Sequence, residues 1–328
     1  MVNRFGVALS FALLAMASCG GDGDGKYVPD GTEIEDTRVA DEAGVPDAVV
    51  DVPEQENLAP LDIVDQDISP EEWDKLYGGE CKLAERVGLV EVFRADWGQM
   101  VQARFKDKVA ATEVFEEVAV EGGCRLLNRA APECTPSCNQ QTEQCSLAES
   151  CEPLPALLDV GTVTVSGLSF AAALSPNANN DYGKFDFPQE PLFVDGALIE
   201  VSIPEGPLGP FQMQGRGVAG IVMVEPPVTI SKGAGFDLAW EESGGSGEVF
   251  IQVSLENHAT TPLTIQCTVP DTGGITISQD FIDQLLAAWV AGTVVATVQR
   301  RTVDAESFKS GCIEFQVYSD WDKDLEVK

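Results

Sequence analysis

The chain has 328 residues, a formal net charge of −34 at pH 7 and nine cysteines. This acidic balance argues against nucleic-acid binding, which requires a basic footprint. It also argues against an electrostatic grip on anionic lipid headgroups.

The first residues have the pattern of a secretory signal peptide. Arg4 gives a short positive start, residues 5–17 form an apolar run, and small residues follow. A membrane-spanning helix needs about 20 apolar residues, and this run is shorter. We therefore expect residues 1–18 to be removed as a signal peptide.

Two interpretations of the cleavage site stay open. Residues 15–17 form an A-x-A site, where cleavage would release a soluble protein. Residues 16–19 resemble the lipobox of bacterial lipoproteins, with Met16 where that family usually has Leu. There Cys19 becomes the lipidated N-terminus, carrying fatty acids such as palmitate. Lipid on Cys19 leaves eight cysteines that can all pair, and Gly20 favours the outer membrane in proteins of this kind.

Residues 19–72 are expected to form the lipidated cysteine and a disordered acidic tether. Acidic residues far outnumber Lys26 and Arg38, the two bases of this segment, and prolines interrupt it repeatedly. Such a segment buries too little apolar surface to offset its ordering entropy. A spacer that lifts a folded body off the membrane is the favoured interpretation, and a cation- or partner-binding tail is the alternative.

Residues 73–328 are predicted to form a mainly β body. Apolar residues alternate with polar ones, as in strands with one buried face, and clusters of Gly and Pro separate the segments. Many short strands of this kind indicate an antiparallel β-sandwich, Ig-like or jelly-roll-like. The expected strands are residues 87–93, 101–108, 114–120, 197–203, 236–240, 248–255, 263–269 and 312–317.

One short helix is predicted after Ser278, which has the side chain of an N-cap. Asp280 lies in the first turn and Gly292 terminates the segment. The apolar face is formed by Phe281, Ile282, Leu285 and Trp289. We expect this helix to close one end of the sandwich by packing.

A cysteine-rich insert is predicted at residues 129–156. Its cysteines are spaced C-x3-C-x6-C-x5-C, unlike the close pairs of a zinc site, and the only histidine is distant. An exported chain meets an oxidising compartment in which thiols pair. Of the three pairings that four cysteines allow, the interleaved one, Cys134–Cys145 and Cys138–Cys151, suits a small knot.

The other four cysteines are expected to pair as Cys81–Cys124 and Cys267–Cys312. Cys267 points with the apolar face of its strand. Cys312 has the opposite phase to Ile313, so that the second bond needs a twist or a bulge.

Residues 122–138, 150–168, 267–277 and 300–317 resemble uncharacterised lipoproteins of myxobacteria and related deltaproteobacteria. The resemblance covers most of residues 80–318 and implies secretion, disulfides and a β-rich body. Its motifs are cysteine and turn landmarks, so it carries over no functional residues.

Catalytic and metal-binding motifs are scarce in the sequence. His258 stands alone in an expected loop, and neither a nucleophile elbow nor a Walker or dinucleotide pattern occurs. The abundance of carboxylates prevents any pair from being chosen. No cofactor is expected, apart from calcium as a weak candidate at Asn177, Asn179 and Asp181, whose oxygens recur at alternate positions.

The leading hypothesis is a non-enzymatic lipoprotein of the cell envelope. Its lipid holds it in the outer membrane, and its β-sandwich serves a structural or binding role toward an envelope protein or a glycan. One alternative is an envelope hydrolase of glycosidase type that uses a carboxylate pair. The other is a calcium-dependent adhesion module.

Overall fold

The computed structural model describes residues 79–328, except for 96–97, 130–132, 140, 171, 185–190, 204, 246, 257–262 and 289–291. These residues belong to a compact unit that spans Asp65–Lys328. The predicted signal peptide, Cys19, the predicted tether and His258 lie outside the described residues.

The described part of the chain is mainly β, as the sequence predicts. Each strand expected from the alternation of apolar and polar residues is present, and further strands occur between them. The strands are β1 (Arg86–Ala95), β2 (Gly98–Phe105), β3 (Phe115–Glu121), β4 (Cys124–Arg129), β5 (Glu143–Cys145), β6 (Cys151–Pro153), β7 (Val163–Ser166), β8 (Ala172–Leu174), β9 (Tyr182–Lys184), β10 (Leu198–Ile203), β11 (Phe211–Arg216), β12 (Thr229–Ile230), β13 (Phe236–Ala239), β14 (Glu248–Glu256), β15 (Leu263–Pro270), β16 (Gly274–Ile277), β17 (Thr293–Phe308) and β18 (Gly311–Val327). A 3-10 turn, η1 (Ala111–Glu113), and a helix, α2 (Gln279–Ala287), complete the described elements.

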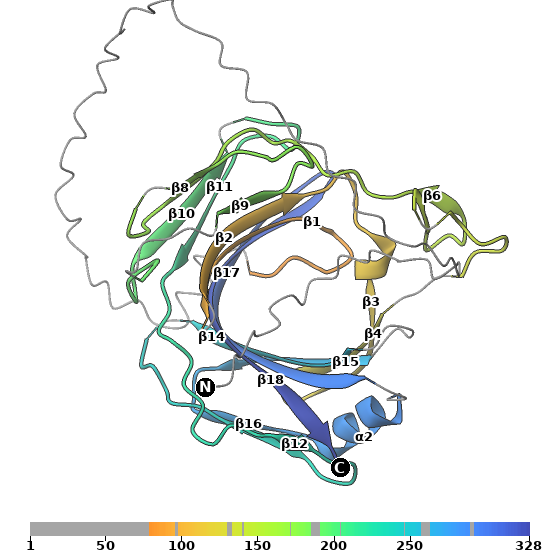
Figure 1. Ribbon diagram of the computed structural model, residues 1–328, viewed down its shortest axis with the longest axis vertical. Coiled ribbons are helices and arrows are strands. Elements are labelled where there is room, and N and C mark those ends of the chain that lie inside the picture. The colour runs from red at the N-terminus through yellow and green to blue at the C-terminus, as the bar shows by residue number, and fades with distance from the viewer. Residues whose placement is uncertain are drawn as a thin grey trace, which may run out of the picture. The chain divides into compact units, whose positions relative to one another are not determined.

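A large curved sheet organises the body (Figure 1). Its strands follow the order β3-β4-β15-β14-β17-β18-β1-β2-β9, and β12 pairs with the end of β18. Smaller sheets, β11-β10-β7-β8 and β13-β16, lie outside the curve, whereas β5-β6 belongs to the insert. The strand pairs are antiparallel, as in the predicted sandwich, apart from the parallel pairs β1–β18 and β12–β18.

Two hydrophobic cores fill the space between the large sheet and its covers. The first core lies between β1, β2 and the first half of β18 on one side and the four-stranded sheet on the other. The second lies between β4, β14, β15 and the first half of β17 on one side and β13, β16 and α2 on the other. Fully buried examples are Phe105, Val201 and Phe315 in the first core and Ile251, Ile265 and Leu285 in the second.

The paired strands β17 and β18 run through both cores. They have 16 and 17 residues, and their register is continuous from Val294–Leu325 to Phe308–Gly311. Val298 contributes to the second core and Val317, on the partner strand, to the first. The two cores therefore share the central strands of one sheet.

Helix α2 confirms the predicted helix and its N-cap. The Ser278 hydroxyl accepts a hydrogen bond from the Phe281 amide at 3.4 Å, which satisfies one of the open N–H groups of the first turn. Phe281, Ile282, Leu285 and Leu286 are buried, so the helix packs against the second core as expected. No helix among the described residues is long and apolar enough to cross a membrane.

Two of the predicted disulfides are wrong. The structure pairs Cys81 with Cys312 and Cys124 with Cys267, in place of Cys81–Cys124 and Cys267–Cys312. Cys124 lies directly opposite Cys267 because β4 and β15 are neighbours in the sheet. Cys81 lies beside the start of β18, where the Cys312 amide donates to the Glu85 carbonyl at 2.8 Å. The opposite phases of Cys267 and Cys312 reflect their places on opposite faces of the sheet.

The cysteine-rich insert has the pairing that suits a small knot. Cys134 bonds to Cys145 and Cys138 to Cys151, and the short hairpin β5–β6 sets Cys145 opposite Cys151. Few buried side chains support this segment, so the two disulfides supply its constraint.

Candidate functional site

The face of the large sheet opposite to the two cores is mostly polar, with a small apolar cluster of Phe93, Met100 and Tyr318. We call it the inner face, because the sheet curves around it (Figure 1). Successive side chains of a strand point to opposite faces, so the residues that alternate with the core residues lie on this face. The inner face contains Glu91, Gln102, Arg125, Phe250, Gln252, Gln266, Arg301, Glu314, Gln316 and Tyr318.

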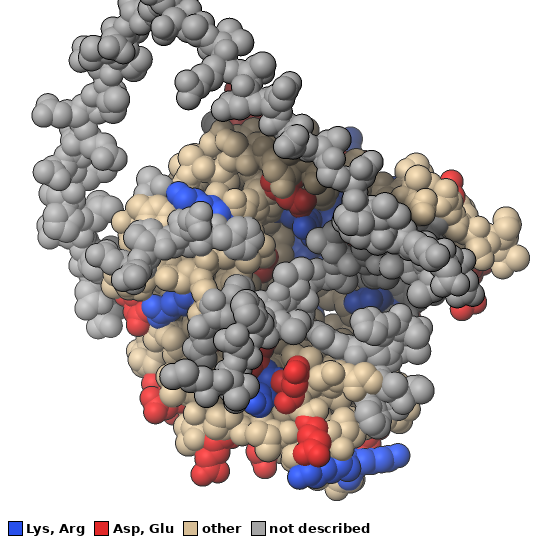
Figure 2. Space-filling model, in the orientation of Figure 1, with Lys and Arg blue, Asp and Glu red and all other residues tan. Residues whose placement is uncertain are grey.

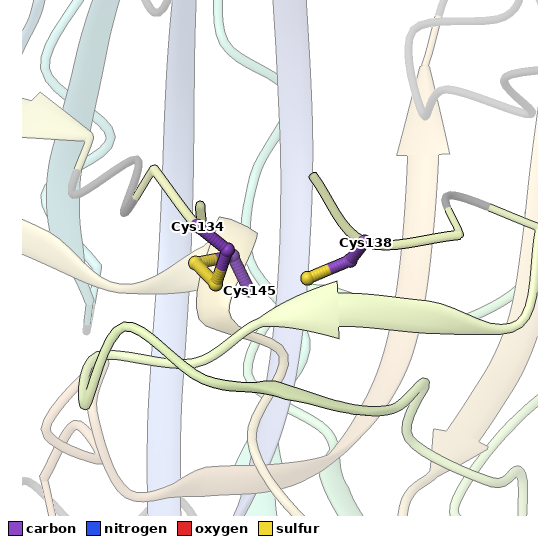
Figure 3. A group of neighbouring side chains, drawn as sticks. All are labelled: Cys134, Cys138 and Cys145. Atoms are coloured by element: carbon purple, nitrogen blue, oxygen red, sulfur yellow. A yellow bond between two sulfur atoms is a disulfide. The ribbon is translucent and has the colours of Figure 1, made fainter. Parts of the chain in front are cut away.

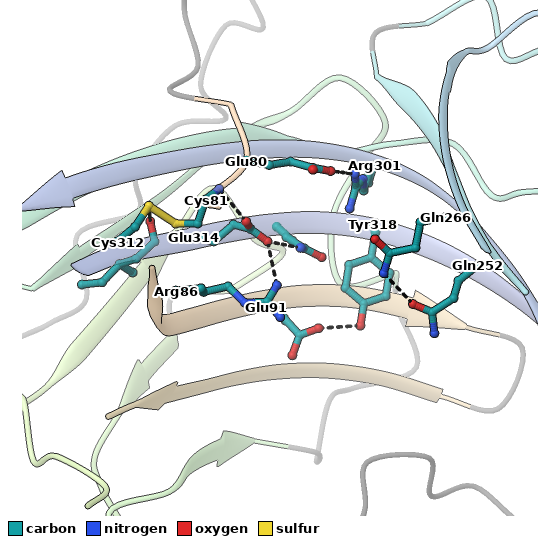
Figure 4. Close-up of polar contacts among 12 residues, drawn as sticks. Glu80, Cys81, Arg86, Glu91, Gln252, Gln266, Arg301, Cys312, Glu314 and Tyr318 are labelled. Carbon is teal, nitrogen blue, oxygen red and sulfur yellow. Dashed lines mark hydrogen bonds and ion pairs between the residues drawn. A yellow bond between two sulfur atoms is a disulfide. The ribbon is translucent and has the colours of Figure 1, made fainter. Parts of the chain in front are cut away.

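Arg301 is the most enclosed cation of the inner face. Its side chain is 3% exposed, and its Nε donates to Glu248 Oε1 at 2.9 Å. A terminal nitrogen contacts Glu80, and the guanidinium lies 4.0 Å from the centre of the Phe250 ring. Glu80 comes from the segment before β1, so this contact joins the start of the folded body to its central strands (Figure 4).

A row of hydrogen bonds continues from Glu80 across three strands. Glu80 Oε2 lies 3.5 Å from an Arg125 nitrogen, and that nitrogen donates to Gln266 Oε1 at 3.0 Å. The Gln266 amide then donates to Gln252 Oε1 at 3.1 Å. Each side chain is held by its neighbour, so the donors and acceptors of this row have fixed positions.

Glu314 forms a second enclosed cluster. It is 2% exposed, and its carboxylate accepts from the Cys81 amide at 2.9 Å. The Gln316 amide also donates to it, and Arg86 lies 3.3 Å away (Figure 4). These contacts, together with the Cys81–Cys312 disulfide, hold the segment before β1 against the inner face.

Glu91 and Tyr318 occupy neighbouring parallel strands, β1 and β18. The Tyr318 hydroxyl donates to Glu91 Oε1 at 3.0 Å, the Gln102 amide donates to Oε2 at 2.7 Å, and the Phe93 ring stacks on Tyr318. Burial raises the pKa of Glu91 and outweighs the effect of these two hydrogen bonds. Burial, followed by the charge of Glu91, raises the pKa of Tyr318 well above its ordinary value, so the hydroxyl keeps its proton.

A pocket of about 440 Å³ opens at the end of the inner face beside β3. It joins the row of hydrogen bonds, because Glu80, Arg125 and Gln266 belong to both, and Glu248, a partner of Arg301, also lines it. The remaining lining residues are Glu117, Val120, Gly123, Cys124 and Thr268. The pocket combines carboxylates, a guanidinium, an amide and a hydroxyl, which are groups that orient a polar ligand.

The calcium candidates lie at the opposite edge of the large sheet, just before β9. Asn177 Oδ1 accepts from the Asn179 amide at 2.8 Å and from the Asp181 amide at 3.1 Å, which is the geometry of an Asx turn. Asp181 Oδ1 lies 3.0 Å from Arg104 Nε. Asn177 and Asp181 therefore already have partners within the protein, and calcium binding stays a prediction.

Sulfur atoms of Cys134, Cys138 and Cys145 lie within 4.8 Å of one another (Figure 3). Metal ligation requires thiolates, and these sulfurs are bound in disulfides. Their proximity follows from two neighbouring disulfides in a small segment.

The described charged side chains are scattered over the face of the molecule shown in Figure 2. On the face shown in Figure 2, the coloured Lys and Arg side chains stand apart from one another among the acidic ones.

Comparisons with known proteins give little help. No protein-family model matches the chain, and no curated protein matches it. A solved structure, that of the chicken CNTN1 FN1-FN3 domains, is similar at 6% sequence identity with a TM-score of 0.16. The match covers 65% of this chain and 66% of that chain, just under two thirds of each. A likeness of this size supports no conclusion, so the inner face must be interpreted from its own geometry.

The residues of the inner face were not identified by sequence reasoning. Glu314 and Gln316 alternate with apolar residues, which is the pattern of a strand with a solvated polar face. The one available signal is the Arg300-Arg301 pair inside a run of alternating apolar residues, because a strand places two adjacent arginines on opposite faces.

Proposed function

We propose that the protein is an exported lipoprotein of the cell envelope whose β body is a non-enzymatic binding module. Cys19 carries the lipid that anchors it in the outer membrane, and residues 20–72 act as the tether. The pairing of the cysteines supports the anchor: the described disulfides use eight of the nine cysteines and leave Cys19. Disulfides also favour an oxidising compartment outside the cytoplasm.

The polar row on the inner face is the observation that carries the binding role. Gln252, Gln266 and Arg125 connect through Glu80 to Arg301, and this row borders an open pocket. Polar groups held in fixed positions lose little freedom when a ligand replaces water, which favours affinity and specificity. The partner is a neighbouring envelope protein or a glycan.

The anchor is tested by Cys19→Ser in the native host. Lipid attachment needs the thiol, so the variant should leave the membrane fraction or remain unprocessed. Membrane partitioning equal to that of the parent chain would reject the anchor.

The binding role is tested by site-specific photo-crosslinking in living cells. A crosslinking amino acid at Thr268, which is exposed and lines the pocket, should capture a partner. The same amino acid at Glu205, an exposed position in the loop after β10, is the matched control. Equal yields from the two positions, or none from either, would contradict the proposal.

A second candidate function is a hydrolase that uses Glu91 and Glu314. The favouring observation is that these two carboxyl groups lie on the same face of the neighbouring strands β1 and β18. The pKa of Glu91 is raised by burial, as in a general acid, and Glu314 is ion-paired with Arg86. Each carboxyl group is already held by protein donors, so we expect no turnover of glycan, peptide or ester substrates, with or without calcium. Hydrolysis that is abolished by Glu91→Gln would favour the enzyme instead.

A further inference from the structure

We propose that β3 accepts an extended, basic segment of a partner protein as an added strand, with one basic side chain in the pocket beside it. This inference rests on the proposed binding function and names the partner class. It requires an open sheet edge, a pocket on the correct face and a complementary charge, and the described residues show each of them.

The open edge is the outer side of β3. In the order of the large sheet β3 is the terminal strand, and among the described residues only β4 pairs with it. Every second N–H and C=O of an edge strand points away from the sheet, and an extended peptide pairs with such groups. The Val118 and Val120 side chains of β3 are 52% and 62% exposed, so apolar contacts are available along the same strand.

A bulge between Glu117 and Ala119 interrupts the pairing of β3 with β4. Bulges and charges on edge strands limit unselective pairing with other strands. Glu116, Glu117 and Glu121 add charge to this strand, which carries no base. The edge is therefore closed to acidic strands and remains open to a partner whose charge offsets these three carboxylates.

The pocket lies where a side chain of an added strand would point. Glu117 and Val120 line it from β3, and Arg125, Gln266 and Thr268 line it from the next two strands. Neighbouring strands place facing side chains about 5 Å apart on the same face. An added strand would thus project alternate side chains toward the inner face, directly beside Glu117.

Glu117 is the acid that remains available for a partner. Among the described residues no ion pair includes it, whereas Glu80 and Glu248 both contact Arg301. The pocket lining contains three carboxylates against the single guanidinium of Arg125. A lysine or arginine side chain in the pocket would balance this charge by a charge-assisted hydrogen bond to Glu117.

Two other occupants of the edge are disfavoured by charge. The segment 20–72 of this chain is rich in acidic residues and would be repelled by the glutamates of β3. A second copy that pairs β3 with β3 would bring glutamates opposite glutamates, which is destabilising. A basic segment of another protein meets neither objection.

The test uses the full-length lipidated chain in detergent and a short synthetic peptide that alternates lysine and threonine. Fluorescence anisotropy gives the dissociation constant. The alternating peptide should bind, and the same peptide with N-methyl groups on alternate amides should bind at least about tenfold more weakly, since it cannot complete a strand ladder. A peptide of the same composition with its lysines in one block controls for charge alone.

Variants of the chain locate the site. Glu117→Lys should weaken binding of the alternating peptide by at least about tenfold, because it replaces attraction by repulsion at the pocket. Glu205→Lys makes the same change of charge at a distant exposed position and should alter binding by less than about twofold. Glu117→Gln keeps the shape of the side chain and removes its charge. It therefore tests the same contact if the lysine variant misfolds.

Equal binding of the N-methylated peptide, or equal losses from the two lysine variants, would overturn the proposal and indicate general attraction to an acidic protein. Absence of peptide binding would also overturn it. A crosslink from Thr268 that persists in that case would keep the binding module and point to a glycan or another partner. Absence of both would remove the proposed function as well.

Discussion

Arg300 and Arg301 are neighbours in β17 but lie on opposite faces of the same sheet. Arg300 faces outward, where two nitrogens contact Asp271 at 2.9 and 3.2 Å and the terminal nitrogens also donate to three backbone carbonyls. Its partner Asp271 has a side chain only 7% exposed. Arg301 faces inward, and its partners Glu80 and Glu248 have side chains 30% and 35% exposed. The outer cluster is closed within the protein, whereas the inner one keeps contact with water.

The difference indicates that the two faces have different roles. An ion pair whose groups are all enclosed can only hold the fold, because no other molecule reaches it. A pair whose acids remain partly solvated can exchange contacts with a ligand at modest cost. The outer cluster therefore stabilises the sheet, whereas the cluster at Arg301 keeps the partly solvated groups that the proposed binding function requires.

The largest expected loss of stability comes from removing one disulfide from either face of the large sheet. Cys124–Cys267 lies on the outer face and Cys81–Cys312 on the inner face, with sequence separations of 143 and 231 residues. In the chain-entropy model, replacing either pair by alanine should lower the free energy of unfolding by about 5 kcal/mol. Removing Cys134–Cys145, which spans only 11 residues, should cost about 3 kcal/mol or less. Denaturant unfolding measures all three variants, and a loss from the insert as large as the other two would contradict the expectation.

The next largest losses of stability are expected when Arg300 or Arg301 is replaced. Arg300→Met leaves the enclosed Asp271 without its cation, and we expect a loss of about 4 kcal/mol in the free energy of unfolding. Arg301→Met returns Glu80 and Glu248 to water, and we expect about 2 kcal/mol. Both variants are compared by denaturant unfolding at one pH. Equal losses would mean that the two faces do not differ in this way.

The third test uses pH. The contributions of Glu91 on the inner face and Asp271 on the outer face to stability change in opposite directions as pH rises. Burial raises the pKa of Glu91 on the inner face, so its favourable contribution is present below the ordinary value of 4.5 and is lost as pH rises through the raised pKa. Burial alone would raise the pKa of Asp271, but hydrogen bonds from Arg300, Ser243 and Trp240 together lower it. The contribution of Asp271 is therefore present above its ordinary value of 3.8 and is lost as pH falls through the lowered pKa.

Urea midpoints measured between about pH 3 and about pH 8 check these signs. Glu91→Gln should remove part of the decline in stability toward neutral pH, whereas Asp271→Asn should remove part of the decline in acid. The same pH dependence in both variants would refute the assignment.

The smallest expected effect on stability is at the edge of the inner face. Glu117 is exposed and has no ion pair among the described residues, so Glu117→Gln should leave the free energy of unfolding unchanged. The same variant should weaken binding of the basic peptide by up to about tenfold. A measurable loss of stability would show that Glu117 stabilises the fold and is not available to bind a partner.

The mainly β class, most strands and the helix could be predicted because they depend on local patterns. Alternation marks Ile251 and Val253 as facing one side, and Ser278 caps a helix through atoms close in sequence. The full length of β17 is harder to predict from the sequence. Arg300 and Thr302 interrupt its apolar alternation where the strand passes from one core to the other.

The long-range disulfides and the inner face could not be predicted in the same way. Cys81 meets Cys312 only because β1 lies parallel to β18, a pairing that no local pattern specifies. A glutamate that alternates with apolar residues is expected to face water, so Glu314 gave no sign that it is enclosed. Its enclosure depends on the curvature of the whole sheet and on the segment at Glu80 and Cys81.

The Cys81–Cys312 bond has a mechanical consequence. Cys81 lies just before β1, Cys312 stands near the start of β18, and these two strands run parallel in the middle of the large sheet. A pull on the chain that precedes Gly79 therefore reaches the starts of both strands together. The disulfide thus divides a load that enters ahead of β1 between two central strands of the sheet.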